Sequence, residues 1–229
     1  MGQDIQKECT RCGTCCAKGG PALHKSDLEL YKKGVFQRKD LMTFRRGEVV
    51  RDNVTGQLAP LEEELVKITR RNASTWTCSF FNVVDRLCFI YNDRPIECRT
   101  LDCWNPESLE AMYDQERITR ADILGEDNGY AELVATHEEK CGYEYLGTVY
   151  ERMKSGDASA EEEMLEAVRF DMAFRKVVQE KAGVPANEME FLFGRTLAET
   201  FPMFGLRVVE TEHGPELEPY SRKEEKKAV

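Results

Sequence analysis

Four cysteines fall within eight residues near the start of this sequence, in the stretch Cys9–Cys16. Disulfides between such close positions are difficult, because the bond requires Cα separations and Cβ directions that short spacings rarely meet. Thiolates that converge on a metal are an easier solution, since a turn at Gly13 allows several sulfur atoms to face one point. The spacing Cys9-x2-Cys12-x2-Cys15 is the one with which iron–sulfur and zinc sites begin. The stretch therefore predicts a thiolate-bound metal.

The adjacent residues Cys15 and Cys16 add a constraint to this site. Neighbouring side chains in an extended segment point to opposite sides. Both sulfur atoms would then reach one ion only with difficulty. We expect either that Cys15 and Cys16 serve different metals, or that one of them is not a direct ligand.

A second group of cysteines follows further along the chain, at Cys78, Cys88, Cys98 and Cys103. Each of these could be an ordinary buried thiol, because cysteine is common in protein cores. They become better candidates for metal ligands beside the first group, since four thiolates cannot comfortably include both Cys15 and Cys16. Nine cysteines in all suit one iron–sulfur cluster with spare thiols, or two separate metal sites.

His137 and Cys141 form a further pair of candidate ligands. They lie four residues apart at the end of a segment, Tyr130–Lys140, that has a helical pattern, so they can share one helix face and one metal. The alternative is a histidine in solvent among charged neighbours, because histidine is often a polar surface residue. We favour the solvent-exposed histidine and retain Cys141 as a candidate ligand.

The charge of the chain excludes some classes of function. A net charge of −10 over 229 residues argues against sequence-independent nucleic-acid binding, which needs a basic surface. No apolar run approaches the roughly 20 residues of a membrane span. The segment Met1–Glu8 is polar and lacks the apolar region of a signal peptide. Because nine cysteines also cannot pair completely, we expect a reducing, cytoplasmic location where the thiols are available to metal.

Local patterns predict an α+β fold with the strands in the first half. Glu48–Arg51 and Gln57–Leu61 flank a turn, and Leu65–Thr69 alternates like a further strand. A small antiparallel sheet is therefore expected between Glu48 and Phe81, next to several helices. Asp40–Phe44 is expected to form one more turn of helix.

Three regions are expected along the chain. The break at Ser155–Ser159 is the clearest in the sequence and marks a soft boundary. The regions are a cysteine-rich metal-binding domain at residues 1–154, a helical extension with a short hairpin at 159–220, and a disordered tail at 221–229.

The extension is expected to contain two helices, Ser159–Lys181 and Asn187–Thr200. The first carries an apolar stripe that includes Met172. Large apolar residues such as Phe170 and Phe193 fall off the main stripes. They predict a second apolar surface that covers the metal domain or meets another chain.

The ordered series of cysteine motifs resembles the CxxCxxCC family, also called YkgJ-like, of zinc- or iron-chelating proteins. The resemblance is carried by Cys9-x2-Cys12-Gly13-x-Cys15-Cys16, Cys78-x-Phe80, Cys88-x-Ile90-Tyr91 and Arg94-Pro95-x2-Cys98-Arg99. The family pattern ends in a later cysteine, for which Cys141 is the nearest match, so the resemblance covers about Cys9 to Cys141. Cys103 falls where the family more often has an apolar or aromatic residue.

This resemblance implies metal chelation and a set of cysteine ligands. The implied cofactor ligands are Cys9, Cys12, Cys15, Cys16, Cys78, Cys88, Cys98 and Cys141, and Cys103 is a further candidate for the metal. A related group, the flagellin lysine N-methylases, carries a similar cluster that is thought to hold iron–sulfur. No convincing methyl-donor site accompanies the cysteines here.

We expect a metal-cluster-binding protein in which iron–sulfur, of the [4Fe–4S] type, is preferred over zinc. It would act in electron transfer or as an accessory subunit, with a redox or assembly protein as its partner. One alternative is a cluster-dependent modifying enzyme resembling the flagellin lysine N-methylases. Another is a structural zinc protein whose helical part binds a protein partner. Enzymatic activity and oligomeric state stay open at this point.

Overall fold

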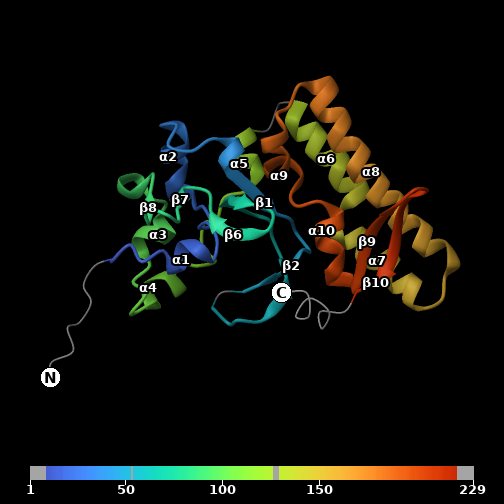
Figure 1. Ribbon diagram of the computed structural model, residues 1–229, viewed down its shortest axis with the longest axis horizontal. Coiled ribbons are helices and arrows are strands. Elements are labelled where there is room, and N and C mark those ends of the chain that lie inside the picture. Colours follow the sequence, from blue (N-terminus) through green and yellow to red (C-terminus); the bar gives the residue numbers. More distant parts are fainter. Residues whose placement is uncertain (1–8, 53, 126–128, 221–229) are drawn as a thin grey trace. The chain divides into compact units, whose positions relative to one another are not determined.

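The computed structural model describes residues 9–52, 54–125 and 129–220 (Figure 1). Helices accompany several small two-stranded sheets, so the expected α+β class is confirmed. Within the described ranges no helix is both long and apolar enough to cross a membrane. The tail expected to be disordered, 221–229, lies outside the described residues.

The chain forms two compact units, and each unit is built from two separate segments. The described residues of Met1–Met42 and Leu65–Ile123 form the first, and those of Thr43–Glu64 and Leu124–Val229 form the second. This division differs from the boundary expected at residues 155–159.

The reason for this difference is that the break at 155–159 is the turn of a helical hairpin. α7 (Tyr143–Lys154) and α8 (Ala158–Ala182) lie on its two sides, and Val149 and Val168 are buried in one shared core. A short connection lets two amphipathic helices bury their apolar faces against each other.

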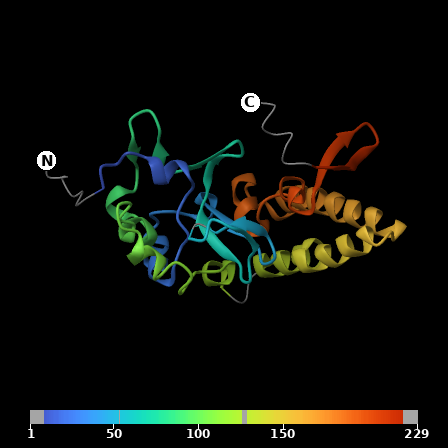
Figure 2. The same ribbon diagram turned by 90° about the horizontal axis from the view of Figure 1, so that it is seen from below.

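The first unit contains short helices and short strands. Its helices are α1 (Thr14–Ala17), α2 (Leu28–Lys32), α3 (Ile96–Thr100), α4 (Glu107–Glu110) and α5 (Arg120–Leu124, which ends just past the unit). Its strands are β1 (Leu41–Phe44, which continues into the second unit), β4 (Leu65–Ile68), β5 (Arg70–Asn72), β6 (Thr75–Cys78), β7 (Phe81–Asn82) and β8 (Leu87–Cys88). The expected single sheet is replaced by separate pairs: β1 with β4, β5 with β6, and β7 with β8. Figures 1 and 2 show α1 beside the β7–β8 hairpin.

Asp40–Phe44 was expected to be helical, and this expectation is wrong. All four side chains of β1 are buried, and the strand pairs with β4. Burial on both faces favours a strand inside a sheet over one isolated helical turn. The core around these strands includes Leu23, Leu41, Val66, Ile68 and Ile118.

The second unit is mainly helical. Its helices are α6 (Gly129–Cys141), α7, α8, α9 (Met189–Phe193) and α10 (Leu197–Thr200). Two antiparallel hairpins complete it: β2 (Val49–Arg51) with β3 (Leu58–Pro60), and β9 (Leu206–Thr211) with β10 (Gly214–Pro219). Both hairpins confirm the strands and turns expected from the sequence.

The single helix expected over Asn187–Thr200 is interrupted at Gly194, between α9 and α10. Gly194 has φ 68° and ψ −165°, and an added Cβ would lie 3.0 Å from Arg45 Cγ. This backbone conformation is accessible essentially to glycine, so the chain turns there. Phe193 is fully buried inside the second unit, so it contributes to a core and not to a second apolar surface.

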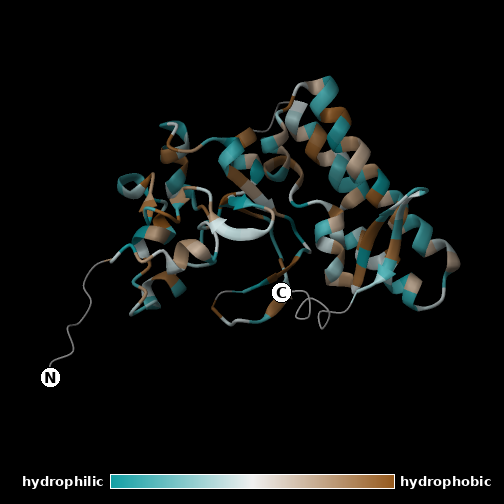
Figure 3. Ribbon diagram, viewed as in Figure 1, coloured by the Kyte–Doolittle hydropathy of each residue, from teal (hydrophilic) through white to brown (hydrophobic). Residues whose placement is uncertain are grey.

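The buried face of α8 also differs from the expected stripe. Met172 is 44% exposed, whereas the charged residues Asp171 and Arg175 are buried. Figure 3 shows apolar and polar residues alternating along this helix. The true buried face therefore contains an ion pair.

Candidate metal centre

The first cysteine loop ends in the short helix α1. Gly13 precedes α1 with φ 83°, and the Ala17 N–H donates to the Gly13 carbonyl at 2.8 Å. The Arg11 N–H lies 3.4 Å from Cys9 Sγ, and Cys12 Sγ lies 3.3 Å from Thr14 Oγ1. Three of the four cysteines, Cys9, Cys12 and Cys15, are exposed, and Cys16 is half-buried. Within this loop, a backbone N–H therefore contacts the sulfur of Cys9, and a threonine hydroxyl contacts the sulfur of Cys12.

This loop is attached to the β7–β8 hairpin at two points. Arg86 Nη2 donates to the Cys12 carbonyl at 2.7 Å. A Cβ added to Gly13 would lie 2.3 Å from Phe81 Cζ, so the Gly13 backbone lies directly on the Phe81 ring. Phe81 in turn pairs with Cys88 across the hairpin. The hairpin therefore places Cys88 next to the segment that carries the first group.

We expect Gly13→Ala to weaken metal binding by disturbing this loop. Alanine pays about 1 kcal/mol or more in the left-handed region, and its methyl group would also overlap the Phe81 ring. Gly34→Ala is the matched control, because Gly34 has φ 76° and open space around its Cβ position. Metal content and thermal unfolding of both variants measure the difference. Equal effects of the two substitutions would show that the contact with Phe81 is unimportant.

The extended backbone assumed for Cys15 and Cys16 is not found, and whether the two residues bind one metal stays a prediction. Both residues lie in α1, where neighbouring side chains are rotated by about 100° and not 180°, and their sulfur atoms are 4.0 Å apart. The hydrogen bond between them lowers the pKa of Cys15 to about 6. The same bond, together with burial, raises the pKa of Cys16. This hydrogen bond thus favours the thiolate form of Cys15 and the thiol form of Cys16.

The second cysteine group contributes thiols from three elements of the first unit. Cys78 ends β6 and is buried, Cys88 lies in β8, and Cys98 lies in α3. Burial raises the pKa of Cys78 to about 11 and also raises that of Cys98. These thiols keep their protons unless a cation compensates the charge, as a thiophilic metal does.

Electrostatic interactions connect the two groups. The charge of Cys15 acts on the pKa values of Cys12, Cys78 and Cys98, and the charge of Cys88 acts on those of Cys78 and Cys98. Charges on Cys78 and Cys98 also raise the pKa of Cys16. The structure therefore brings six cysteines into one neighbourhood of the first unit: Cys12, Cys15, Cys16, Cys78, Cys88 and Cys98.

The other three candidate cysteines have different surroundings. Cys9 is exposed at the start of the first loop, and Cys103 is exposed between α3 and α4. Cys141 is fully buried at the end of α6, in the second unit. Cys9 belongs to the same loop as Cys12, whereas Cys141 belongs to the core of the second unit.

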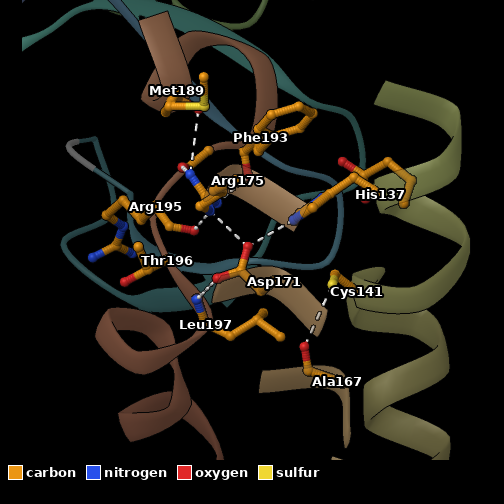
Figure 4. A network of polar contacts seen from close by, with 12 residues as sticks. His137, Cys141, Ala167, Asp171, Arg175, Met189, Phe193, Arg195, Thr196 and Leu197 are labelled. Atoms are coloured by element: carbon orange, nitrogen blue, oxygen red, sulfur yellow. Dashed lines mark hydrogen bonds and ion pairs between the residues drawn. The ribbon is translucent and has the colours of Figure 1, made fainter. Parts of the chain in front are cut away.

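His137 was expected to face solvent, and this expectation is wrong. His137 is fully buried, and its Nε2 donates to Asp171 Oδ1 at 2.7 Å (Figure 4). Asp171 Oδ1 also accepts from Arg175 Nε at 2.7 Å, and Oδ2 accepts from the Leu197 N–H at 3.0 Å. The apolar periodicity of the sequence did not predict this network. The signal that could have found it is the oppositely charged pair Asp171 and Arg175, four residues apart on α8.

Donor atoms of His137, Cys141 and Asp171 lie within 4.8 Å of one another, which raises the question of a second metal site. Burial lowers the pKa of His137 and raises that of Cys141 to about 12, so both groups are neutral. Burial alone would raise the pKa of Asp171, but the bond from His137 and the charge of Arg175 lower it to about 2. Arg45 Nη1 lies 3.5 Å from His137 Nδ1.

A divalent cation does not suit this position. Both oxygens of Asp171 are already occupied by donors, and two guanidinium groups, from Arg45 and Arg175, face the set. Arg175 also donates to the backbone carbonyls of Met189, Phe193, Gly194 and Arg195. The network thus joins α6, α8 and the α9–α10 turn as a structural hub.

Comparison with known proteins identifies a metal-chelating domain in the N-terminal half of the chain. The family model CxxCxxCC, described as "Putative zinc- or iron-chelating domain", matches residues 8–122. This region contains every cysteine except Cys141. No curated protein and no solved structure matches the chain.

Proposed function

Because this chain belongs to the CxxCxxCC family of zinc- or iron-chelating domains, we propose that its first unit holds an iron–sulfur cluster of the [4Fe–4S] type. The protein would act as an electron carrier or as an accessory subunit to a redox or assembly partner. The observation that carries the proposal is the convergence of six thiols from α1, β6, β8, α3 and the first loop. Soft thiolate ligands of this kind select iron–sulfur clusters or zinc.

The proposed ligands come from Cys9, Cys12, Cys15, Cys16, Cys78, Cys88 and Cys98. These are the cysteines of the first loop and of the three elements that converge on it. Cys103 departs from the family pattern. Cys141 donates a weak hydrogen bond to the Ala167 carbonyl at 3.7 Å inside the second unit, which supports a structural role.

The proposed ligands differ in their exposure to solvent. When bound, an iron–sulfur cluster supplies one-electron transfer. Cys78 and Cys98 line the inner side, where burial excludes water, whereas Cys9 and Cys12 lie on the exposed side. A half-exposed site of this kind is open to a protein partner. The proposal also places the protein in a reducing cytoplasm, where thiols stay available to metal.

Anaerobic purification followed by metal analysis and absorption spectroscopy tests the proposal. We expect iron, sulfide and a visible absorption that bleaches on reduction. Cys98→Ser should lose most of the metal, because a serine oxygen is a poor ligand for soft metals. Cys103→Ser and Cys141→Ser are the matched controls and should retain it. Colourless protein with bound zinc would favour a structural zinc site, and folded protein without metal would overturn metal binding.

A further inference from the structure

We propose that Arg11 and Arg94, which both pack against the ring of Tyr91, are positioning residues that hold the first cysteine loop against the second cysteine segment and balance the charge of the thiolate centre. This inference rests on the metal-binding function proposed above. It assigns a role to Arg11 and Tyr91, which no sequence pattern connects.

The three side chains form a stack in the first unit. Arg11 Cζ and Arg94 Cζ each lie 3.9 Å from the centroid of the Tyr91 ring. Both guanidinium groups therefore pack against the same aromatic ring. Arg94 Nε also donates to the Tyr91 carbonyl at 2.9 Å, which fixes the second guanidinium. The ring's negative faces attract both cations.

This stack joins two segments that carry the proposed ligands. Arg11 lies in the first loop, between Cys9 and Cys12, and Tyr91 and Arg94 lie between Cys88 and Cys98. The stack and the Arg86–Cys12 hydrogen bond are two separate attachments of the loop. Losing the stack should therefore loosen the first ligands without releasing the loop completely.

Arg11 adopts an unfavourable backbone conformation where its side chain contacts Tyr91. Its φ is +56°, in the left-handed region that non-glycine residues rarely adopt. In this conformation its N–H points at Cys9 Sγ, at 3.4 Å, while its side chain contacts Tyr91. Arg11 thus orients the Cys9 thiol through its backbone N–H and places its own guanidinium group on the Tyr91 ring.

Two like charges on one ring repel each other, and nearby negative charge offsets this repulsion. Arg11 directly precedes Cys12, and Arg94 lies between Cys88 and Cys98, so both cations belong to segments that carry the proposed thiolates. Several thiolates on a metal give a net negative centre, which two adjacent guanidinium groups stabilise. Removing either cation should weaken metal binding and make the centre harder to reduce.

The test measures metal affinity by competition with a chelator, and the midpoint potential of the centre, for Arg94→Gln, Arg11→Gln, Arg94→Lys and the control Arg71→Gln. Arg71 is an exposed arginine of the same unit, on β5. We expect Arg94→Gln and Arg11→Gln each to bind the metal about tenfold more weakly than the wild type. At a fixed applied potential, each should also lower the ratio of reduced to oxidised protein about tenfold, which corresponds to a midpoint potential lower by 59 mV for one electron. The Arg71→Gln variant should match the wild type.

Arg94→Lys separates charge from simple loop attachment. Lysine keeps the positive charge but loses the planar stack, so this variant should recover most of the potential and only part of the affinity. A potential that falls equally in Arg94→Lys and Arg94→Gln would overturn the role in charge balance. Metal-loaded glutamine variants with wild-type affinity and potential would overturn the inference as a whole. A wild-type protein that binds no metal would instead overturn the proposed function.

Discussion

Removal of the metal is expected to unfold the first unit and leave the second unit folded. The proposed ligands come from four short elements and one loop, none of which is stable alone, since isolated helices of this length are marginal. The binding free energy of a structural metal is folding free energy, on the order of 10 kcal/mol for small zinc sites. The second unit has its own core and a 25-residue helix, α8.

The two units can be followed separately in one sample. Both tryptophans of the chain, Trp76 and Trp104, belong to the first unit, so tryptophan emission reports its unfolding. The longest helices, α6, α7 and α8, belong to the second unit, so helical circular dichroism reports mainly on that part. We expect chelation to shift the emission of the half-buried Trp104 toward that of solvent-exposed tryptophan, with a smaller change at Trp76, which is already 41% exposed, while most of the helical signal remains. Native emission after complete metal removal would contradict this prediction.

Asp171→Asn is expected to unfold the second unit more easily, with little effect on metal content. The substitution keeps the size of the side chain but removes a buried carboxylate that accepts from His137, Arg175 and the Leu197 N–H. Breaking a buried ion pair by removing one partner leaves an uncompensated charge and costs about 3–5 kcal/mol. Chemical denaturation followed by circular dichroism measures the loss.

Asp157→Asn provides the matched control for Asp171→Asn. Asp157 is the half-buried cap of α8, where its side chain accepts from the Ser159 N–H and pairs with Arg152 at 2.7 Å. Asparagine caps helices as well as aspartate does, and a partly exposed ion pair contributes only about 0–1 kcal/mol. The control should therefore change the free energy of unfolding far less. A similar small effect for both variants would show that the Asp171 network is not a hub of the second unit.

The same network predicts how the stability of the second unit depends on pH. Burial lowers the pKa of His137 below its usual 6.5, so below that pH the unfolded chain binds a proton that the folded chain does not. Stability is therefore lost as the pH falls below about 6.5, by at most about 1.4 kcal/mol per pH unit for this group. Asp171, with its pKa lowered to about 2, adds a further loss between about pH 4 and 2. Asp171→Asn should remove the second loss.

Sequence alone was sufficient for features that depend on neighbouring residues. The spacing of Cys9, Cys12 and Cys15 indicated metal binding, because ligand spacing in a loop is a local property. The β2–β3 and β9–β10 hairpins were predicted for the same reason, since a turn and the alternation on its two sides lie within a few residues. The α+β class followed from these local patterns together.

Tertiary structure alone decided which distant residues meet. Leu41–Phe44 became a strand because β4 pairs with it, and His137 became a core residue because Asp171, on another helix, accepts a hydrogen bond from it. The gathering of Cys15, Cys78 and Cys98 is also a long-range result. Contacts of this kind depend on how whole elements pack, and packing free energy outweighs local preference where the two disagree.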